Sequence, residues 1–129
     1  MVIDASALLA VLQAEPERED FLAKIEAAGL RLMSTASTVE TSMEVLSRSG
    51  EDGLVILNAL VRNLRIEQAP FTVEQAAIAV DAFRRFGKGR HPANLNLGDC
   101  FSYALSKATG EPLLYKGEDF SRTDIRRTA

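Results

Sequence analysis

The first four residues constrain the fold most strongly. Met1-Val2-Ile3 is a short apolar run that stops at an acidic residue, Asp4, as a buried strand does at its carboxyl end. Ser6 can then cap a helix over Ala7–Leu12, whose side chains are apolar nearly all round and therefore indicate burial. A buried strand followed at once by a buried helix is typical of an α/β domain.

The rest of the chain continues this alternation of short strands and helices. We expect further strands at Leu30–Met33, Arg65–Gln68 and Pro112–Tyr115, with an edge strand around Thr123–Ile125. We expect a helix from Pro16 to Gly29, and another that begins at a cap at Ser34, Thr35 or Ser37 and ends at Gly50. Further helices are expected over Leu54–Leu64, from Thr72 to Phe83, and from Leu97 or Gly98 to Gly110. The polar segment Gly87–Asn96 is expected to be a loop. This pattern predicts a three-layer α/β sandwich in which helices flank a central, mostly parallel sheet.

Composition limits the classes of protein to which the chain can belong. Its 129 residues, 47% hydrophobic and 26% charged, suit one globular domain spanning 1–129. The net charge of -3 means that any contact with nucleic acid must rest on a local basic patch. The single cysteine, Cys100, excludes an internal disulfide and fits a reducing compartment. No apolar run is long enough for a membrane span, so we expect a cytoplasmic protein that does not enter membranes.

Four carboxylates occupy special places in this predicted layout. Asp4 ends the first strand, Glu40 lies in the opening turns of the third helix, Asp99 lies in the first turn of the sixth, and Asp119 follows the last buried strand. Strand carboxyl ends and helix N-termini share one edge of a parallel sheet, so all four can converge there. Taken singly, Glu40 also fits a solvated helix position, Asp99 a helix N-terminus, and Asp119 a turn.

Carboxylates gathered in one crevice repel one another, which raises their pKa values and weakens the fold. A hard divalent cation removes this penalty, and Mg²⁺ prefers a few carboxylates together with water and substrate phosphate. The chain offers no histidine or thiolate set that would favour zinc. The constellation therefore predicts metal-assisted hydrolysis of a phosphodiester, with the Ser6 hydroxyl near the metal but not bound to it directly.

A basic segment precedes the loop that leads to Asp99. Its cations, which fall within seven residues free of acids, are Arg84, Arg85, Lys88 and Arg90. We expect them to contact the phosphates of a nucleic acid, and Lys116, close to Asp119, to act in the same way. The alternative is a solvated helix end whose arginines complement the helix dipole.

Other phosphate chemistries require residues that this chain lacks. A haloacid-dehalogenase-type phosphatase needs a second Asp two residues after the first, where this chain has Ser6. A response-regulator receiver needs a phospho-accepting Asp at the end of a middle strand, and Leu30–Ser34 provides none. The segment Gly87-Lys88-Gly89-Arg90 has neither the spacing nor the Ser/Thr of a phosphate-binding glycine loop.

Three segments resemble a known family. The opening MVIDASALLA, residues 1–10, resembles the start of PIN-domain ribonucleases. HPANLNLGDC, residues 91–100, and LLYKGEDFSRTDI, residues 113–125, are similar to the VapC toxin branch of that family. With the start of the helix that carries Glu40 between them, the resemblance runs from end to end of the chain.

The resemblance implies an α/β sandwich on a parallel sheet and an endoribonuclease that depends on Mg²⁺ or Mn²⁺ and cuts structured RNA. It also implies a homodimer inhibited by a VapB-type antitoxin. The apolar Val55 and Ile56 extend beyond the main stripe of their helix, so that helix is either deeply buried or covers a partner such as this. The family's four acids fall on Asp4, Glu40, Asp99 and Asp119, with Glu118 as the alternative to Asp119. A non-catalytic PIN-like module that binds RNA or protein is the competing function.

Overall fold

The computed structural model describes residues 1–129 and is built on a sheet of four short strands. They are β1 (Val2–Ile3), β2 (Leu32–Ser34), β3 (Glu67–Ala69) and β4 (Leu113–Leu114), arranged in the order β3-β2-β1-β4. All three pairings are parallel. The carboxyl ends of all four strands therefore lie along the same edge, with β1 in the interior of the sheet.

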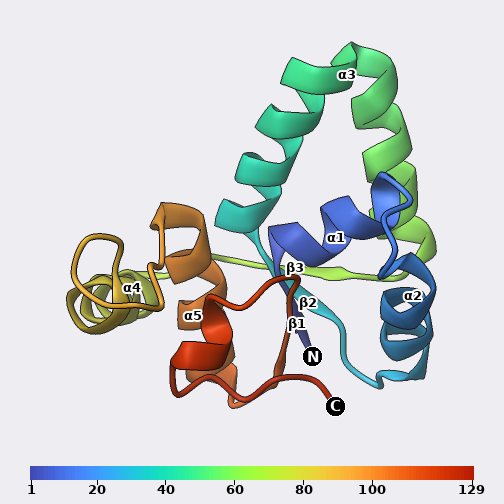
Figure 1. Cartoon of the computed structure of the whole chain (residues 1–129). Coiled ribbons are helices and arrows are strands. Elements are labelled where there is room, and N and C mark those ends of the chain that lie inside the picture. The colour runs from blue at the N-terminus through green and yellow to red at the C-terminus, as the bar shows by residue number, and fades with distance from the viewer.

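Helices cover both faces of this sheet (Figure 1). The helices α1 (Ala5–Leu12), α2 (Arg18–Ala27) and α3 (Thr35–Asn63) lie on one side, and α4 (Val73–Phe86) and α5 (Leu97–Thr109) lie on the other. No helix is long and apolar enough to cross a membrane.

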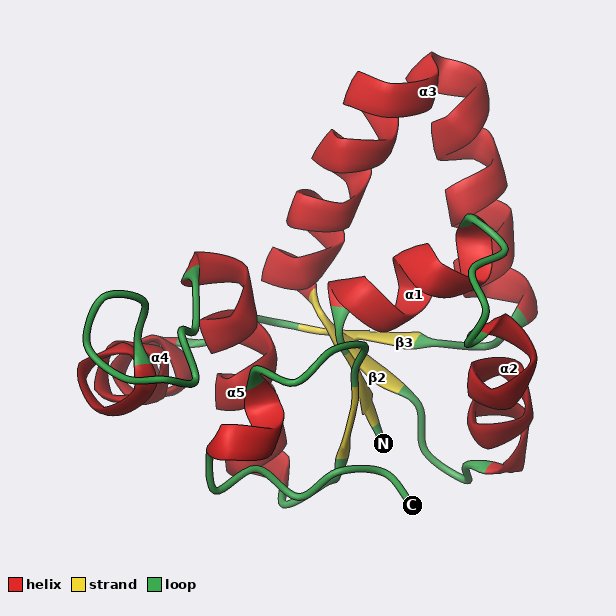
Figure 2. Cartoon of the chain, viewed as in Figure 1, coloured by secondary structure: helices red, strands yellow, loops and turns green.

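Successive residues of a strand pack into two separate hydrophobic cores, one on each face of the sheet. Ile3 and Leu114 join a cluster with α1, α2 and α3, whereas Val2 and Leu113 join a second cluster with α4 and α5. The division follows from strand geometry, because successive side chains point to opposite faces of a sheet. The predicted three-layer sandwich around a parallel sheet is confirmed (Figure 2).

The third and fourth predicted helices form one hairpin-shaped element, α3. Its two arms, 35–49 and 51–63, meet at Gly50, where the backbone takes φ +68°. Glycine adopts this left-handed conformation at little cost, so it allows the sharp bend seen at the tip of α3 (Figure 1). The second arm begins directly after Gly50, earlier than the Leu54 expected from the apolar stripe.

The predicted edge strand around Thr123–Ile125 is wrong. The chain instead forms a short 3-10 helix, η1 (Phe120–Arg122), and pairs with the sheet only through one parallel bridge from Leu113 to Arg127. The Phe120 ring is buried and packs against Tyr115, with ring centroids 5.0 Å apart. The Thr123 hydroxyl donates to Phe120 O at 2.7 Å and accepts Ile125 N–H at 3.1 Å, so these residues form a turn in place of a strand.

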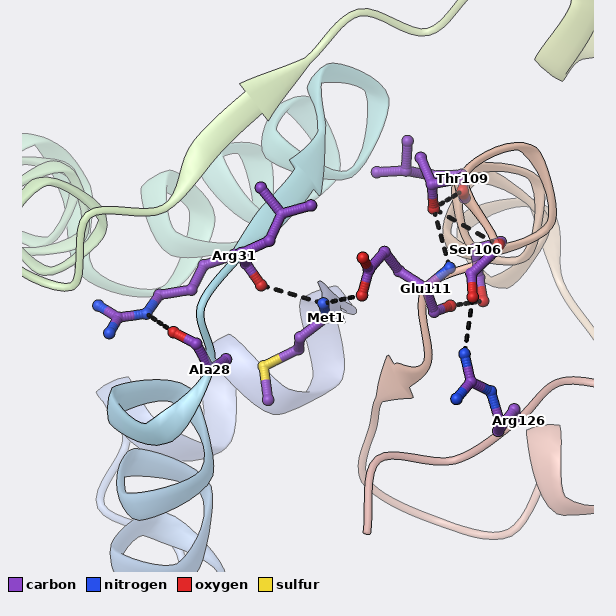
Figure 3. Close-up of polar contacts among 10 residues, drawn as sticks. Met1, Ala28, Arg31, Ser106, Thr109, Glu111 and Arg126 are labelled. Carbon is purple, nitrogen blue, oxygen red and sulfur yellow. Dashed lines mark hydrogen bonds and ion pairs between the residues drawn. The ribbon is translucent and has the colours of Figure 1, made fainter.

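Hydrogen bonds also hold the sheet together at the amino ends of its strands (Figure 3). The Met1 ammonium donates to Leu30 O at 3.0 Å and to Glu111 Oε2 at 2.7 Å. The Ser106 hydroxyl on α5 donates to Glu111 O at 2.6 Å. These contacts join β1, α5 and the start of β4.

Candidate active site

Asp4 stands where β1 ends and α1 begins, and its side chain caps α1. Its Oδ2 accepts hydrogen bonds from the Ser6 backbone N–H at 3.1 Å and from Ser6 Oγ at 2.6 Å, and its Oδ1 accepts one from Ser102 Oγ at 2.5 Å. Only 3% of the residue is exposed. Burial raises the pKa of Asp4, and the hydrogen bonds from Ser102 and Ser6 oppose that rise.

Glu40 reaches the same edge from α3. The helix begins at Thr35 because the Ser34 hydroxyl, at the end of β2, accepts a hydrogen bond from Ala36 N–H. The Glu40 carboxylate lies directly against Gly98, where a β-carbon would overlap it. Burial raises the pKa of Glu40, and the charges of Asp4 and Glu44 raise it further.

Asp99 lies in the first turn of α5 and is held in a capping box. Asn96 N–H donates to Asp99 Oδ2 at 3.0 Å, and Asp99 N–H donates to Asn96 Oδ1 at 2.9 Å. Burial raises the pKa of Asp99 to about 7, against the opposing hydrogen bond from Asn96, and the charges of Asp4, Asp119 and Glu40 add to the rise. Asp99 therefore both helps to cap α5 and lies close enough to the other acids to be affected by their charges.

Asp119 is exposed and precedes η1, where the buried Phe120 fixes the turn after β4. Its charge acts on Asp99. The four acids predicted to converge thus come from four separate segments of the chain, and the structure places the other three where their charges raise the pKa of Asp99. Glu118 is also exposed, and its Oε2 accepts a hydrogen bond from Ser121 Oγ at 3.2 Å.

The donor set suits a hard divalent ion held in part by water. The four groups are carboxylates, and the only nearby thiol, Cys100, is buried and has its pKa raised to about 11 by burial and by the charge of Asp99. No group of three His, Cys, Asp or Glu side chains is arranged to hold an ion by itself. Mg²⁺ keeps several waters and takes only one or two carboxylates directly, so this looser arrangement fits Mg²⁺ and does not fit a closed zinc site.

The predicted basic residues fall into two groups. Arg84 pairs with Asp81 at 3.0 Å, Arg85 pairs with Asp81 and Asp124 at 3.7 and 3.4 Å, and the Lys116 ammonium pairs with Glu15 and Glu17. Lys88 and Arg90 are exposed and make no ion pair. Only the latter two present uncompensated charge in the basic segment.

Two serines that the sequence patterns did not single out as site residues complete the surroundings of Asp4. Ser102 and Ser37 are 1% and 0% exposed, and their hydroxyl oxygens lie 3.3 Å apart. Ser37 precedes Glu40 by three residues, and Ser102 follows Asp99 by three. This is the spacing that places two side chains on the same face of a helix, and it is the one signal that points to them.

Comparison with known proteins shows the family to which the chain belongs. A model of the PIN domain matches residues 1–126. The ribonuclease VapC30 of Mycobacterium tuberculosis is 50% identical over 129 residues, covering 100% of this chain and 98% of the relative. A ribonuclease VapC of Mycolicibacterium smegmatis is 47% identical over 125 residues, covering 97% of each.

Two solved structures share the fold. VapC20 of Mycobacterium tuberculosis, described as a sarcin-ricin loop cleaving toxin, superposes with a TM-score of 0.77 at 16% identity, covering 96% of this chain and 95% of that one. VapBC2 of Rickettsia felis, solved bound to a DNA fragment from its promoter, gives a TM-score of 0.77 at 11% identity, covering 98% and 94%. A parallel sheet with acids at its carboxyl edge, matched end to end in this way, defines a PIN domain. Within that class the chain belongs to the VapC ribonuclease family.

Proposed function

We propose that this protein is an endoribonuclease toxin that uses Mg²⁺ or Mn²⁺ to hydrolyse phosphodiester bonds in structured RNA, such as tRNA or rRNA. The observation that carries the proposal is the convergence of the four carboxyl groups: burial raises the pKa of Asp99 to about 7, and the charges of Asp4, Asp119 and Glu40 add to the rise. Grouped acids of this kind destabilise a fold unless a cation binds them. The nuclease function of the VapC relatives gives the chemistry that such a site would serve.

Asp4, Glu40, Asp99 and Asp119 would hold the metal. When bound, a divalent ion supplies charge neutralisation at the phosphate and a coordinated water with a lowered pKa. Asp4 is fixed by its serine hydrogen bonds and Asp99 by its capping box. Glu40 is held against Gly98 by the close approach of α3 and α5. Rigid placement of the acids lowers the cost of organising the site when metal and RNA arrive.

RNA binding would depend on the exposed cations next to this edge. Lys88 and Arg90 lie in the loop between α4 and α5 and make no ion pair within the chain, so they can neutralise phosphates. Arg84, Arg85 and Lys116 already have acidic partners and would contribute less. An RNA target also agrees with a cytoplasmic location.

A VapB-type antitoxin is the proposed protein partner, by analogy with the toxin–antitoxin complex of Rickettsia felis. Between the end of α1 and the bend of α3 lies a hollow of about 390 Å³. Ile56, one of its lining residues, is 59% exposed, and the neighbouring Val55 is 68% exposed. An apolar segment of the partner would cover these side chains, and a basic side chain could reach the carboxylates.

Self-association is proposed for the apolar surface formed by α4 and α5. An apolar groove of about 450 Å³ runs between α4 and α5, and Leu97, which is 72% exposed, forms part of it. Val39 and Met43 on α3 are also exposed, at 54% and 64%. A homodimer that buries these residues should dissociate on Leu97→Glu, and light scattering coupled to size-exclusion chromatography measures that change.

Cleavage assays on defined RNA test the proposed activity. The purified protein should cut RNA in Mg²⁺ or Mn²⁺ and stop in EDTA, and Asp4→Asn and Asp99→Asn should remain folded but inactive. Glu51→Gln, which changes an exposed acid at the far tip of α3, is the matched control and should cut like the wild type. Folded wild-type protein that binds RNA but never cuts it would instead identify a non-catalytic binding module.

A further inference from the structure

The hydrogen bonds around Asp4 have fixed directions. The Ser102 hydroxyl has one proton, which it donates to Asp4 Oδ1 at 2.5 Å. In the contact between Ser37 and Ser102, at 3.3 Å, Ser37 must therefore be the donor. On the other oxygen, Ser6 Oγ donates to Asp4 Oδ2 at 2.6 Å and itself accepts Lys116 N–H at 3.0 Å.

Two hydroxyl relays thus end on the two oxygens of one carboxylate. One runs from Ser37 through Ser102 to Oδ1, and the other runs from the Lys116 backbone through Ser6 to Oδ2. The first relay is buried along its whole length, since Ser37, Ser102 and Asp4 are 0%, 1% and 3% exposed. A buried hydroxyl pair of this kind has no water to replace a lost partner.

The buried relay also joins the elements that carry the other acids. Ser37 lies on α3 one turn before Glu40, and Ser102 lies on α5 one turn after Asp99. A contact from Ser37 to Ser102 to Asp4 therefore ties α3, α5 and the end of β1 together on the side that faces the acids. Moving any of the three elements would break at least one of these hydrogen bonds.

We infer that Ser102 and Ser37 are positioning residues for the metal site: Ser102 orients the Asp4 carboxylate directly, and Ser37 acts on it through Ser102. This inference rests on the proposed metal-dependent function. Side chains that hydrogen-bond to a metal ligand commonly change metal affinity by about 10- to 100-fold when removed.

The test measures Mn²⁺ affinity by isothermal titration calorimetry on the full chain. Ser102→Ala should weaken Mn²⁺ binding by about 10- to 100-fold, and Ser37→Ala should weaken it less. The double variant Ser37→Ala/Ser102→Ala should bind no more weakly than Ser102→Ala alone, because the first serine acts through the second. An unchanged affinity in Ser102→Ala, or additive losses in the double variant, would overturn the inference.

Ser106→Ala is the matched control. Ser106 lies one turn further along α5, is 4% exposed, and donates to Glu111 O away from the acids (Figure 3). Its loss should lower the melting temperature, because Glu111 O loses this hydrogen bond, while Mn²⁺ affinity stays at the wild-type value. A similar loss of Mn²⁺ affinity in this control would assign the Ser102 effect to general destabilisation and also overturn the inference.

Circular dichroism of the variants, and Mn²⁺ binding and RNA cleavage by the wild type, separate failure of the relay from unfolding and from failure of the proposed function. If circular dichroism shows that Ser102→Ala is unfolded, Ser37→Ala decides alone: weaker Mn²⁺ binding supports the relay, and unchanged binding refutes it. Wild-type protein that neither binds Mn²⁺ nor cuts RNA in an EDTA-sensitive way would refute the proposed function itself. Wild-type protein that does both, with Ser102→Ala identical to it, refutes only the relay.

Discussion

The Glu40 carboxylate occupies the space beside Gly98 that the β-carbon of any other residue would need. Glu40 comes from the second turn of α3 and Gly98 from the first turn of α5, so this contact sets how closely the two helices approach. Burial at this contact, together with the charges of Asp4 and Glu44, raises the pKa of Glu40. A substitution at Gly98 can therefore disturb the Glu40 carboxylate while leaving the fold intact.

Gly98→Ala should leave the fold intact and impair the site. Alanine is the better helix residue by up to about 1 kcal/mol, and the group it displaces is the end of a flexible side chain. We expect the free energy of unfolding in urea to change by no more than about 1 kcal/mol, while RNA cleavage falls by about tenfold or more. Gly29→Ala, where nothing lies within 4 Å of the added carbon, should leave RNA cleavage unchanged. Full activity in Gly98→Ala would show that Glu40 is not needed at this position.

Stability should depend on pH through Asp99. Its pKa is near 7 in the folded protein and near 4 in an unfolded chain. Between these values the folded state binds more protons than the unfolded state, so the free energy of unfolding falls as pH rises. Asp99→Asn keeps an oxygen acceptor for Asn96 N–H and removes the charge.

In EDTA, Asp99→Asn should therefore be more stable than the wild type at pH 8, by on the order of 1 kcal/mol, and the difference should shrink toward pH 4. Urea unfolding at several pH values measures this. Adding Mn²⁺ at pH 8 should stabilise the wild type more than the variant, because the ion binds the folded state. Equal stability of the two proteins at pH 8 would contradict the burial argument for Asp99.

The two unpaired cations should dominate RNA binding. Lys88→Ala and Arg90→Ala should each weaken binding and reduce the slope of log affinity against log salt by about 0.7–0.9. Fluorescence anisotropy with labelled RNA in EDTA, over a range of KCl concentrations, measures both quantities. Arg84→Ala removes an arginine that is paired with Asp81 and serves as control. Unchanged affinity and an unchanged salt slope in both Lys88→Ala and Arg90→Ala would instead favour the alternative of a solvated helix end.

Asp124 should hold the C-terminal segment against α4 and α5. Its carboxylate accepts a hydrogen bond from Tyr103 Oη at 2.7 Å and pairs with Lys107 at 2.9 Å and Arg85 at 3.4 Å. Asp124→Ala leaves the hydroxyl proton of the buried Tyr103 without an acceptor, so we expect a loss of about 1 kcal/mol in the free energy of unfolding, most of it from that hydrogen bond.

Thermal unfolding measures this loss, and RNA cleavage well below the melting temperature should be retained. Asp81→Ala removes an acid whose ion pairs are exposed and should cost less than about 0.5 kcal/mol. If Asp81→Ala destabilises the protein as much as Asp124→Ala, the C-terminal contact has no special role.

The sequence was informative where local chemistry decides the structure. Ser34, Thr72 and Asn96 cap the starts of their helices, and short apolar runs predicted the positions of β1, β2 and β4. The positions of Asp4, Glu40 and Asp99 followed from one rule, that strand ends and helix starts share an edge of a parallel sheet. The prediction of an edge strand at Thr123–Ile125 was wrong because the Thr123 hydroxyl closes a turn with Phe120 O and Ile125 N–H.

What the sequence alone determined is therefore the fold class, the order of its elements and the acids at their ends, because hydrophobic periodicity and capping are local properties. Only the tertiary structure decided which arginines are neutralised, that Gly98 makes room for Glu40, and that Ser37 and Ser102 converge on Asp4. These facts join residues up to 98 positions apart. A side chain's long-range partner depends on how whole helices pack, and no local pattern encodes that packing.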